Sequence, residues 1–117
     1  MLREQADALG RANVSMVEQL LPVLDSLELA LGQLGAADEH VRKGLELVYA
    51  ELLGVLEKAG LERIDAVDVP FDPTVHEAVL QEGESDGEPV VADLVRTGYR
   101  LKGRVLRPAM VKVARKD

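Results

Sequence analysis

Apolar residues recur at every seventh position through the first third of the chain, and this spacing constrains the fold more than any other feature. Two interleaved rows carry it: Leu2, Leu9, Met16 and Val23 in one, and Ala6, Asn13, Leu20, Leu27 and Leu34 in the other. The offset between the rows alternates between four and three residues, which is the spacing of the a and d positions of a coiled coil. The pattern therefore predicts a long helix that packs lengthwise against another helix.

Asn13 is the polar member of these rows. If Leu2 occupies a d position, Asn13 occupies an a position, where a lone Asn fixes the register of a parallel helix pair at a cost in stability. Alternatively, Asn13 lies on the solvent side of a monomeric helix. The sequence leaves both interpretations open.

From Val17 onward the apolar stripe widens, and a broad stripe favours a helix bundle over a two-stranded coil. Pro22 lies inside this pattern. Because proline lacks a backbone donor and clashes with the preceding turn, it predicts a helix that is kinked or divided near Leu21. The segment GQLGAADE (residues 32–39) ends this helix.

A second helix is predicted between Asp38, as its N-cap, and Gly60, as a left-handed C-cap. One face of it is apolar and comprises Val41, Leu45, Val48, Leu52, Val55 or Leu56, and Ala59. Two such helices do not bury their own stripes, so we expect a homodimer in which a four-helix bundle continues into a coiled coil. The predicted dimer core consists of Leu20, Leu24, Leu27, Leu31, Leu45, Val48 and Leu52.

Gly44 lies inside this second helix, where glycine costs about 1 kcal/mol relative to alanine. Either the cost is tolerated, or another surface approaches the helix closely at this point. Gly54 raises the same question more weakly.

After Gly60 the apolar period shortens to two, which predicts strands. Lys102–Gly103 is predicted to be the turn of a hairpin that joins Tyr99–Leu101 to a strand around Val105. The acidic, glycine-rich stretch 82–91 predicts a surface loop.

In the last strand, Val111 and Val113 are predicted to share one face while Lys112 points the other way, and Pro108 is expected at a bulge or an edge. The chain is therefore predicted to be an α+β protein. It has a helical dimerisation region at residues 1–60 and a compact, all-β domain at residues 61–117.

Composition narrows the functional classes. Only 3% of the residues are aromatic, namely Tyr49, Phe71 and Tyr99, which leaves little aromatic area for a deep ligand pocket. There is no cysteine, no apolar run near the roughly 20 residues of a membrane span, and no apolar core of a signal peptide in residues 1–5. We expect a soluble, cytoplasmic chain that does not bind membranes.

The net charge of −7 is unevenly spread. Residues 1–95 hold 20 acidic and 6 basic side chains, whereas residues 96–117 hold 8 basic ones and 1 acid. The basic tail either protects exposed strand edges from aggregation or meets an acidic partner. Nucleic acid is disfavoured as a partner, because the rest of the chain would repel phosphate.

The stretch FDPTVHEAV (residues 71–79) holds the residues that most resemble a catalytic or metal site, namely Asp72, His76 and Glu77. His76–Glu77 lacks the second histidine of a metalloprotease helix, and two histidines without cysteine argue against zinc. The chain also has no G-x-S-x-G, Walker or Rossmann pattern. We predict no catalytic residue, no metal, no cofactor and no direct binding of nucleotide.

Four segments resemble the GrpE family in order and spacing: LPVLDSLELAL (residues 21–31), RKGLEL (residues 42–47), FDPTVHEAV (residues 71–79) and GYRLKGRVLRPAMVKV (residues 98–113). The resemblance covers the chain from about Leu20 to its end. Members of this family are nucleotide exchange factors (co-chaperones) of DnaK-type chaperones. The resemblance implies a parallel homodimer whose β domain and adjoining helical face engage the ATPase domain of one DnaK, open its nucleotide cleft and release ADP. This activity supports protein folding and the heat-shock response.

The resemblance also implies roles for single residues. The residues that match partner-contact positions are Gly44, Pro73, Val95, Arg104 and Val113. The residues that match positions shaping the β domain are Phe71, Asp72, His76, Gly98, Tyr99 and Gly103. On this interpretation, the Asp–Pro–His stretch builds a docking surface rather than a catalytic site.

Two departures from the family pattern bear on function. Leu29 stands where members usually carry Arg, so a polar contact is expected to be lost there. The chain also begins where relatives have already passed through an N-terminal arm and much of a stalk helix, so we expect a stalk that is trimmed or naturally short. A coiled-coil scaffold with an appended β module is the alternative function, and a small metal or acid–base enzyme is the third.

Overall fold

The structure is a computed structural model that describes residues 2–83 and 86–116, with side chains for residues 13–83 and 86–115. The predicted seam positions Leu2, Ala6 and Leu9 lie outside the described side chains. The chain divides into two compact parts, called here the helical unit (Met1–Gly60) and the β unit (Leu61–Asp117). Helices followed by a β-sheet unit confirm the predicted α+β class.

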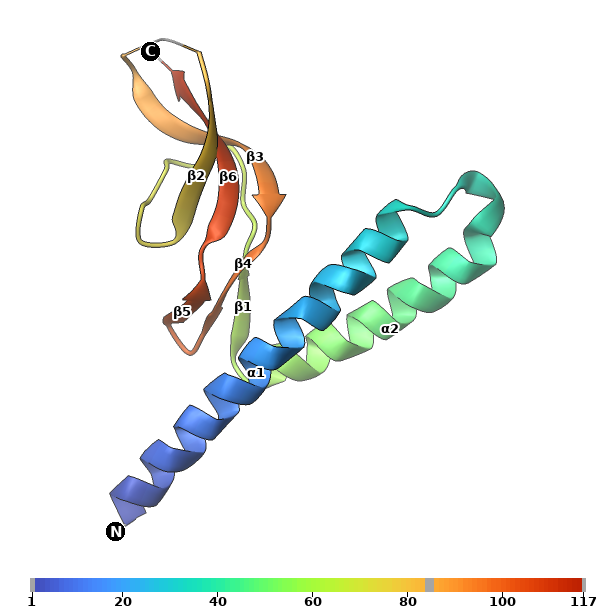
Figure 1. Cartoon of the computed structure of the whole chain (residues 1–117), viewed down its shortest axis with the longest axis vertical. Helices are drawn as coiled ribbons and strands as arrows, with labels where there is room; N and C mark the ends of the chain where they lie inside the picture. The colour runs from blue at the N-terminus through green and yellow to red at the C-terminus, as the bar shows by residue number, and fades with distance from the viewer. Residues whose placement is uncertain (1, 84–85, 117) are drawn as a thin grey trace. The chain divides into compact units, whose positions relative to one another are not determined.

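Helix α1 (Leu2–Gly32) is one uninterrupted helix (Figure 1). It passes through Pro22 without a break, so a division of the helix near Leu21 is not found. Proline removes one backbone donor, but Leu21 and Leu24 around it are buried, and their packing holds the turn in helical form. Asn13 is exposed in the single chain, which agrees with both interpretations of that residue.

A short 3₁₀ turn (Ala36–Asp38) leads into helix α2 (Glu39–Lys58). Asp38 occupies the N-cap position, but its side chain makes no capping bond; its Oδ2 instead accepts a hydrogen bond from the Gly35 N–H at 3.1 Å. Gly60 has φ = 110°, and its N–H donates to the Glu57 carbonyl over 3.0 Å. The left-handed end of α2 at Gly60 is therefore confirmed.

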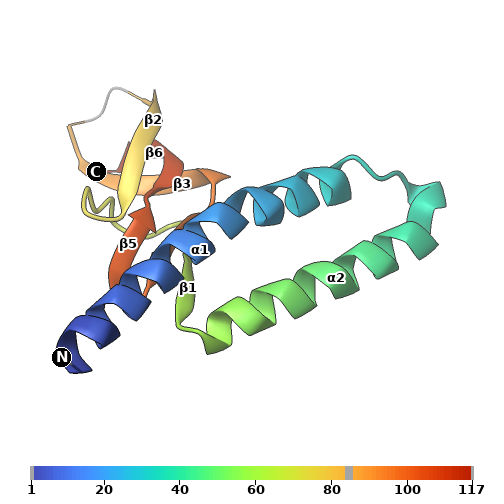
Figure 2. The same cartoon turned by 60° about the horizontal axis from the view of Figure 1, so that its bottom comes forward.

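Helices α1 and α2 lie side by side as a hairpin, which both views show (Figures 1 and 2). The Arg42 guanidinium on α2 donates to the carbonyl groups of Leu31 and Leu34 over 3.3 and 2.8 Å. The Tyr49 hydroxyl donates to Oε1 of Glu28 over 2.7 Å. The Arg42 bonds reach carbonyl groups at and just beyond the end of α1, and the Tyr49 bond reaches a side chain of α1. Together they link α2 to α1.

The β unit contains two three-stranded sheets. The first has the order β1 (Leu61–Ile64), β4 (Gly98–Leu101) and β5 (Arg104–Arg107), with antiparallel neighbours. The second has the order β2 (His76–Glu82), β6 (Ala109–Lys116) and β3 (Glu88–Arg96), in which β6 is parallel to β2 and antiparallel to β3.

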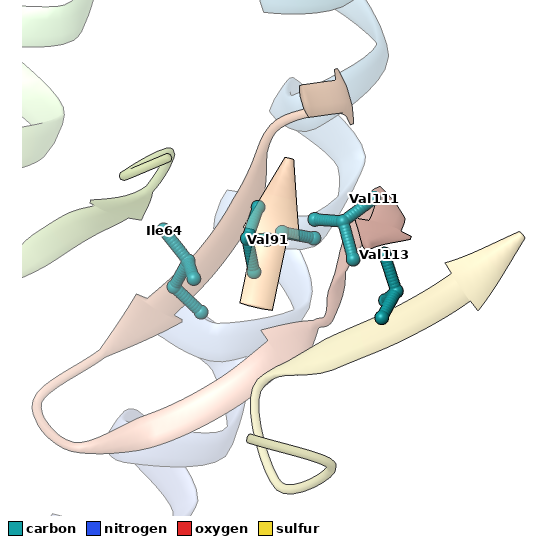
Figure 3. Packing of buried hydrophobic residues seen from close by; sticks show 5 residues of the cluster. Ile64, Val91, Val111 and Val113 are labelled. Atoms are coloured by element: carbon teal, nitrogen blue, oxygen red, sulfur yellow. The ribbon is translucent and has the colours of Figure 1, made fainter. Parts of the chain in front are cut away.

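Buried side chains from both sheets form the core of the β unit: Ile64, Val91, Ala109, Val111 and Val113 (Figure 3). Along β6, Val111 and Val113 face this core, whereas Lys112 between them forms an ion pair with Glu82 at 3.2 Å. The predicted alternation of the last strand is confirmed. Pro108 lies between the ends of β5 and β6, where no ladder bond is required of it.

The predicted hairpin is also confirmed, since β4 and β5 pair across Lys102–Gly103. One other prediction was wrong in extent. The acidic loop is shorter than predicted, because β2 extends to Glu82 and β3 begins at Glu88. Strand β2 also includes the last four residues of FDPTVHEAV, from His76 to Val79.

Candidate functional site

A tight turn at the start of β2 presents Pro73. The Asp72 carbonyl accepts hydrogen bonds from the N–H groups of Val75 and His76, over 3.0 and 2.8 Å. The Asp72 carboxylate accepts two more from Thr74, one from its N–H at 2.9 Å and one from its hydroxyl at 2.7 Å. Pro73 follows Asp72 because its fixed φ suits the second position of such a turn, and its ring is exposed.

His76 completes this turn. Its side chain is 7% exposed, and its Nδ1 accepts a hydrogen bond from the Asp72 N–H at 2.9 Å. The Phe71 ring lies against the imidazole, with the ring centroids 5.7 Å apart. The bonds of Asp72 and His76 hold the local backbone, and the Phe71 ring packs against His76.

The charge of Asp72 is stabilised within the turn. The hydrogen bond from the Thr74 hydroxyl is the main cause that lowers the pKa of the Asp72 carboxyl, followed by the bond from the Thr74 N–H. The charge of His76 lowers this pKa least. Asp72 therefore stays ionised at neutral pH and cannot serve as a general acid there.

Gly98 and Tyr99 set the geometry where β4 meets β6. A Cβ on Gly98 would collide with the backbone nitrogen of Ala109, so only glycine fits. Tyr99 is fully buried, and the Arg107 guanidinium carbon lies 5.2 Å from its ring centroid. Nε of Arg107 also donates to the Thr97 carbonyl over 3.1 Å, which ties β5 to the start of β4.

The hairpin tip offers a charged side chain. Lys102 and Gly103 both have positive φ, 49° and 85°, as a two-residue type I′ turn requires. Arg104 follows directly and is exposed at the start of β5. The turn therefore holds Arg104 at the surface of the β unit.

The predicted contact residues differ in accessibility. Within the β unit Pro73 and Arg104 are exposed, and Val95 on β3 is 53% exposed beside a register shift between Leu94 and Arg96. Val113 is 5% exposed and lies in the core of this unit. Its inward position on β6 makes it a packing residue of the β unit. The partner contact predicted at Val113 stays a prediction.

Gly44 lies on α2, and among the described residues no atom outside its chain neighbours and the adjacent helix backbone comes within 4 Å of the position that a Cβ would occupy. Packing within the chain therefore gives no reason for glycine at this point of the helix. Gly54 is equally open, and Leu29 on α1 is 64% exposed.

The helical unit leaves a heptad-spaced apolar stripe uncovered on each helix. The exposed residues are Met16 and Val23 on α1 and Val41, Val48 and Val55 on α2, all at least 44% exposed. Of the predicted dimer core, Leu24 is buried within the chain, Val48 is exposed, and Leu20, Leu27, Leu31, Leu45 and Leu52 are half-buried. The residues predicted for that core did not include Met16, Val23, Val41 and Val55, although these repeat at the same seven-residue spacing.

Within the described residues, no three His, Asp or Glu side chains gather as metal ligands would. No single helix in the same residues is long and apolar enough to span a membrane; the bent pair 13–32 and 36–58 meets that test only when both helices are taken together, on length and composition alone.

The comparison with known families decides the identity of the chain. A family model described as GrpE matches residues 1–115. The chain belongs to the GrpE family.

Curated relatives carry the same name. Protein GrpE of Parageobacillus thermoglucosidasius is 49% identical over 104 residues, which cover 86% of this chain and 46% of that protein. Protein GrpE of Bacillus subtilis (strain 168) is 46% identical over 103 residues, covering 85% and 54%. Protein GrpE of Alkaliphilus oremlandii (strain OhILAs) is 38% identical over 115 residues, covering 97% and 62%. The chain thus spans about half the length of the curated relatives it matches.

Proposed function

We propose that this chain is an adenine nucleotide exchange factor that binds the ATPase domain of a DnaK-type chaperone, opens its nucleotide cleft and accelerates ADP release. The observation that carries the proposal is membership in the GrpE family over residues 1–115. The exposed positions of Pro73, Val95, Arg104 and Gly44 support it, because side chains or backbone at these points are accessible to a partner.

No catalytic residue is required for this function. A chaperone with an open and a closed cleft shifts toward the open state by the difference in the factor's affinity for the two states. Raising the open population from about 1% to about 99% takes roughly 5.5 kcal/mol of preference. By linkage, ADP weakens the binding of the factor as much as the factor weakens the binding of ADP.

We further propose that the active form is a homodimer joined through the uncovered stripe of the helical unit. A second copy would remove Met16, Val23, Val41, Val48 and Val55 from water, at a gain of about 25 cal/mol per Å² of apolar surface. Burial of the half-exposed leucines of α1 and α2 would add to this gain. The protein is proposed to act in the cytoplasm, in keeping with a chain that has no cysteine.

Stopped-flow release of a fluorescent ADP from a bacterial DnaK, with and without this chain, tests the function directly. We expect acceleration that saturates as the chain is added. Unchanged release by a folded dimer, together with no binding to nucleotide-free DnaK, would favour the alternative of a coiled-coil scaffold with an appended β module.

Gly44→Asp tests the helical contact. We expect slower exchange from a dimer that remains folded, because the site is open within the chain and the carboxylate would intrude only at a partner surface. Gly54→Asp is the matched control, since it places the same side chain at another open glycine of α2. Equal exchange by the two variants would remove Gly44 from the contact.

A further inference from the structure

The hydrogen bond that closes the turn carrying Pro73 can form only while Nδ1 of His76 carries no proton. Nδ1 of His76 accepts from the Asp72 N–H at 2.9 Å, while the Asp72 carbonyl accepts from the His76 N–H at 2.8 Å. The two bonds join the same pair of residues and close a ring that includes Pro73, Thr74 and Val75. An imidazole nitrogen that accepts a hydrogen bond carries no proton.

Protonation of His76 is incompatible with this ring of bonds. An imidazolium is a donor at both nitrogens, so an Nδ1–H would point at the Asp72 N–H and the bond would be lost. The side chain is 7% exposed, and a charge placed there loses most of its hydration. Both effects destabilise the turn when His76 is protonated.

We propose that His76 is a pH-sensitive positioning residue of the docking surface: neutral His76 holds the Asp72–Val75 turn and so presents Pro73, whereas protonated His76 releases the turn and weakens docking. Histidine is the side chain whose unperturbed charge change falls between about pH 5 and pH 8. The inference rests on the proposed function, because Pro73 is a contact only if the β unit docks on the chaperone.

Asp72 is the charged group of the turn that acts on the imidazole. On β2 the neighbouring Glu77 is exposed, and on β6 the register partner of His76 is the uncharged Ala109. Arg107, two residues before Ala109, is engaged with the Tyr99 ring and the Thr97 carbonyl.

Farther along these strands, Lys112 is paired with Glu82. Because the bonds from Thr74 lower the pKa of Asp72, its carboxylate stays charged as the pH falls through the histidine range. Its bonds to Thr74 therefore persist, and His76 is the group that changes.

An NMR titration of the whole chain tests the switch without the chaperone. At neutral pH we expect the His76 ring to carry its proton on Nε2. On acidification, the Asp72 amide should shift and its hydrogen exchange should accelerate in step with protonation of this ring. A ring protonated on Nδ1 at neutral pH, or an Asp72 amide that ignores the titration, would overturn the inference.

Binding to nucleotide-free DnaK tests the consequence. In His76→Asn the Oδ1 atom can accept the same bond but does not titrate, so this variant should bind as the wild type does at neutral pH. Between about pH 7.5 and pH 5.5, the wild type should weaken about fivefold more than His76→Asn, the loss expected from one broken hydrogen bond. His76→Phe, without an acceptor, should bind weakly at both values.

His40 supplies the matched control, because it is exposed at the start of α2 and His40→Gln should keep the wild-type pH profile. If binding to nucleotide-free DnaK weakened equally with falling pH for the wild type and for a folded His76→Asn variant, the switch would be refuted. Absence of binding at neutral pH would refute the proposed function and the docking half of the inference, while the NMR titration decides separately whether the turn opens.

Discussion

At the scale of single residues, the close approach of two backbone segments constrains the packing of the β unit more than side-chain chemistry does. Gly98 lies against Ala109 so tightly that even a methyl group does not fit. The next residue, Tyr99, is fully buried beneath Arg107. The glycine thus lets β4 and β6 approach each other closely. This approach accommodates Tyr99, the largest fully buried side chain, in the β unit.

We predict that Gly98→Ala destabilises the β unit by at least about 1–3 kcal/mol, because the neighbouring atoms are backbone and cannot turn aside. Hydrogen exchange of the β4 and β6 amides measures the effect. Gly54→Ala, at an open glycine of α2, should instead stabilise its helix by up to about 1 kcal/mol. A Gly98→Ala chain with unchanged amide protection would contradict the packing described here.

At the scale of elements, short-range patterns predicted structure well. The alternation of Val111, Lys112 and Val113, the turn at Lys102–Gly103 and the end of α2 at Gly60 all depend on neighbours in sequence, and all three were predicted. Residue spacing and turn chemistry are enough for such features.

Features that depend on distant partners were not predictable in the same way. Strand β2 pairs in parallel with β6, more than thirty residues away, so nothing local marks His76 as the start of a strand. Val113 is buried because β2 and β3 flank it on both sides, which the sequence of β6 does not reveal. Which candidate contact residues are accessible could therefore be determined only from the fold.

Arg42 links the two helices through hydrogen bonds from its guanidinium. We predict that Arg42→Ala destabilises the helical hairpin by about 1–3 kcal/mol, because the carbonyl groups of Leu31 and Leu34 lose charged donors at a partly buried site. Thermal unfolding followed by circular dichroism at 222 nm measures it. Lys43→Ala is the matched control, because Lys43 is adjacent and exposed. An equal loss of stability in Lys43→Ala would argue against a specific role for the Arg42 hydrogen bonds.

At the scale of the whole molecule, the chain consists of two compact units. The β unit has its own core and its own surface residues, whereas the helical unit leaves a regular apolar stripe in water. Exposed apolar residues at heptad spacing are typical of a surface that another helix covers. The helical unit is therefore the part of the chain whose stability should depend on protein concentration.

Val48→Asp tests that dependence. Val48 is the middle residue of the α2 stripe, with Val41 and Val55 one heptad away on either side. Burying a carboxylate there without a partner costs several kcal/mol per copy. We therefore expect light scattering to report a monomer for Val48→Asp and a dimer for the wild type. Leu47→Asp is the control, because Leu47 is as exposed but lies on another face of α2. Dimers that survive Val48→Asp would place the contact elsewhere, and loss of the dimer in both variants would point to general destabilisation of α2.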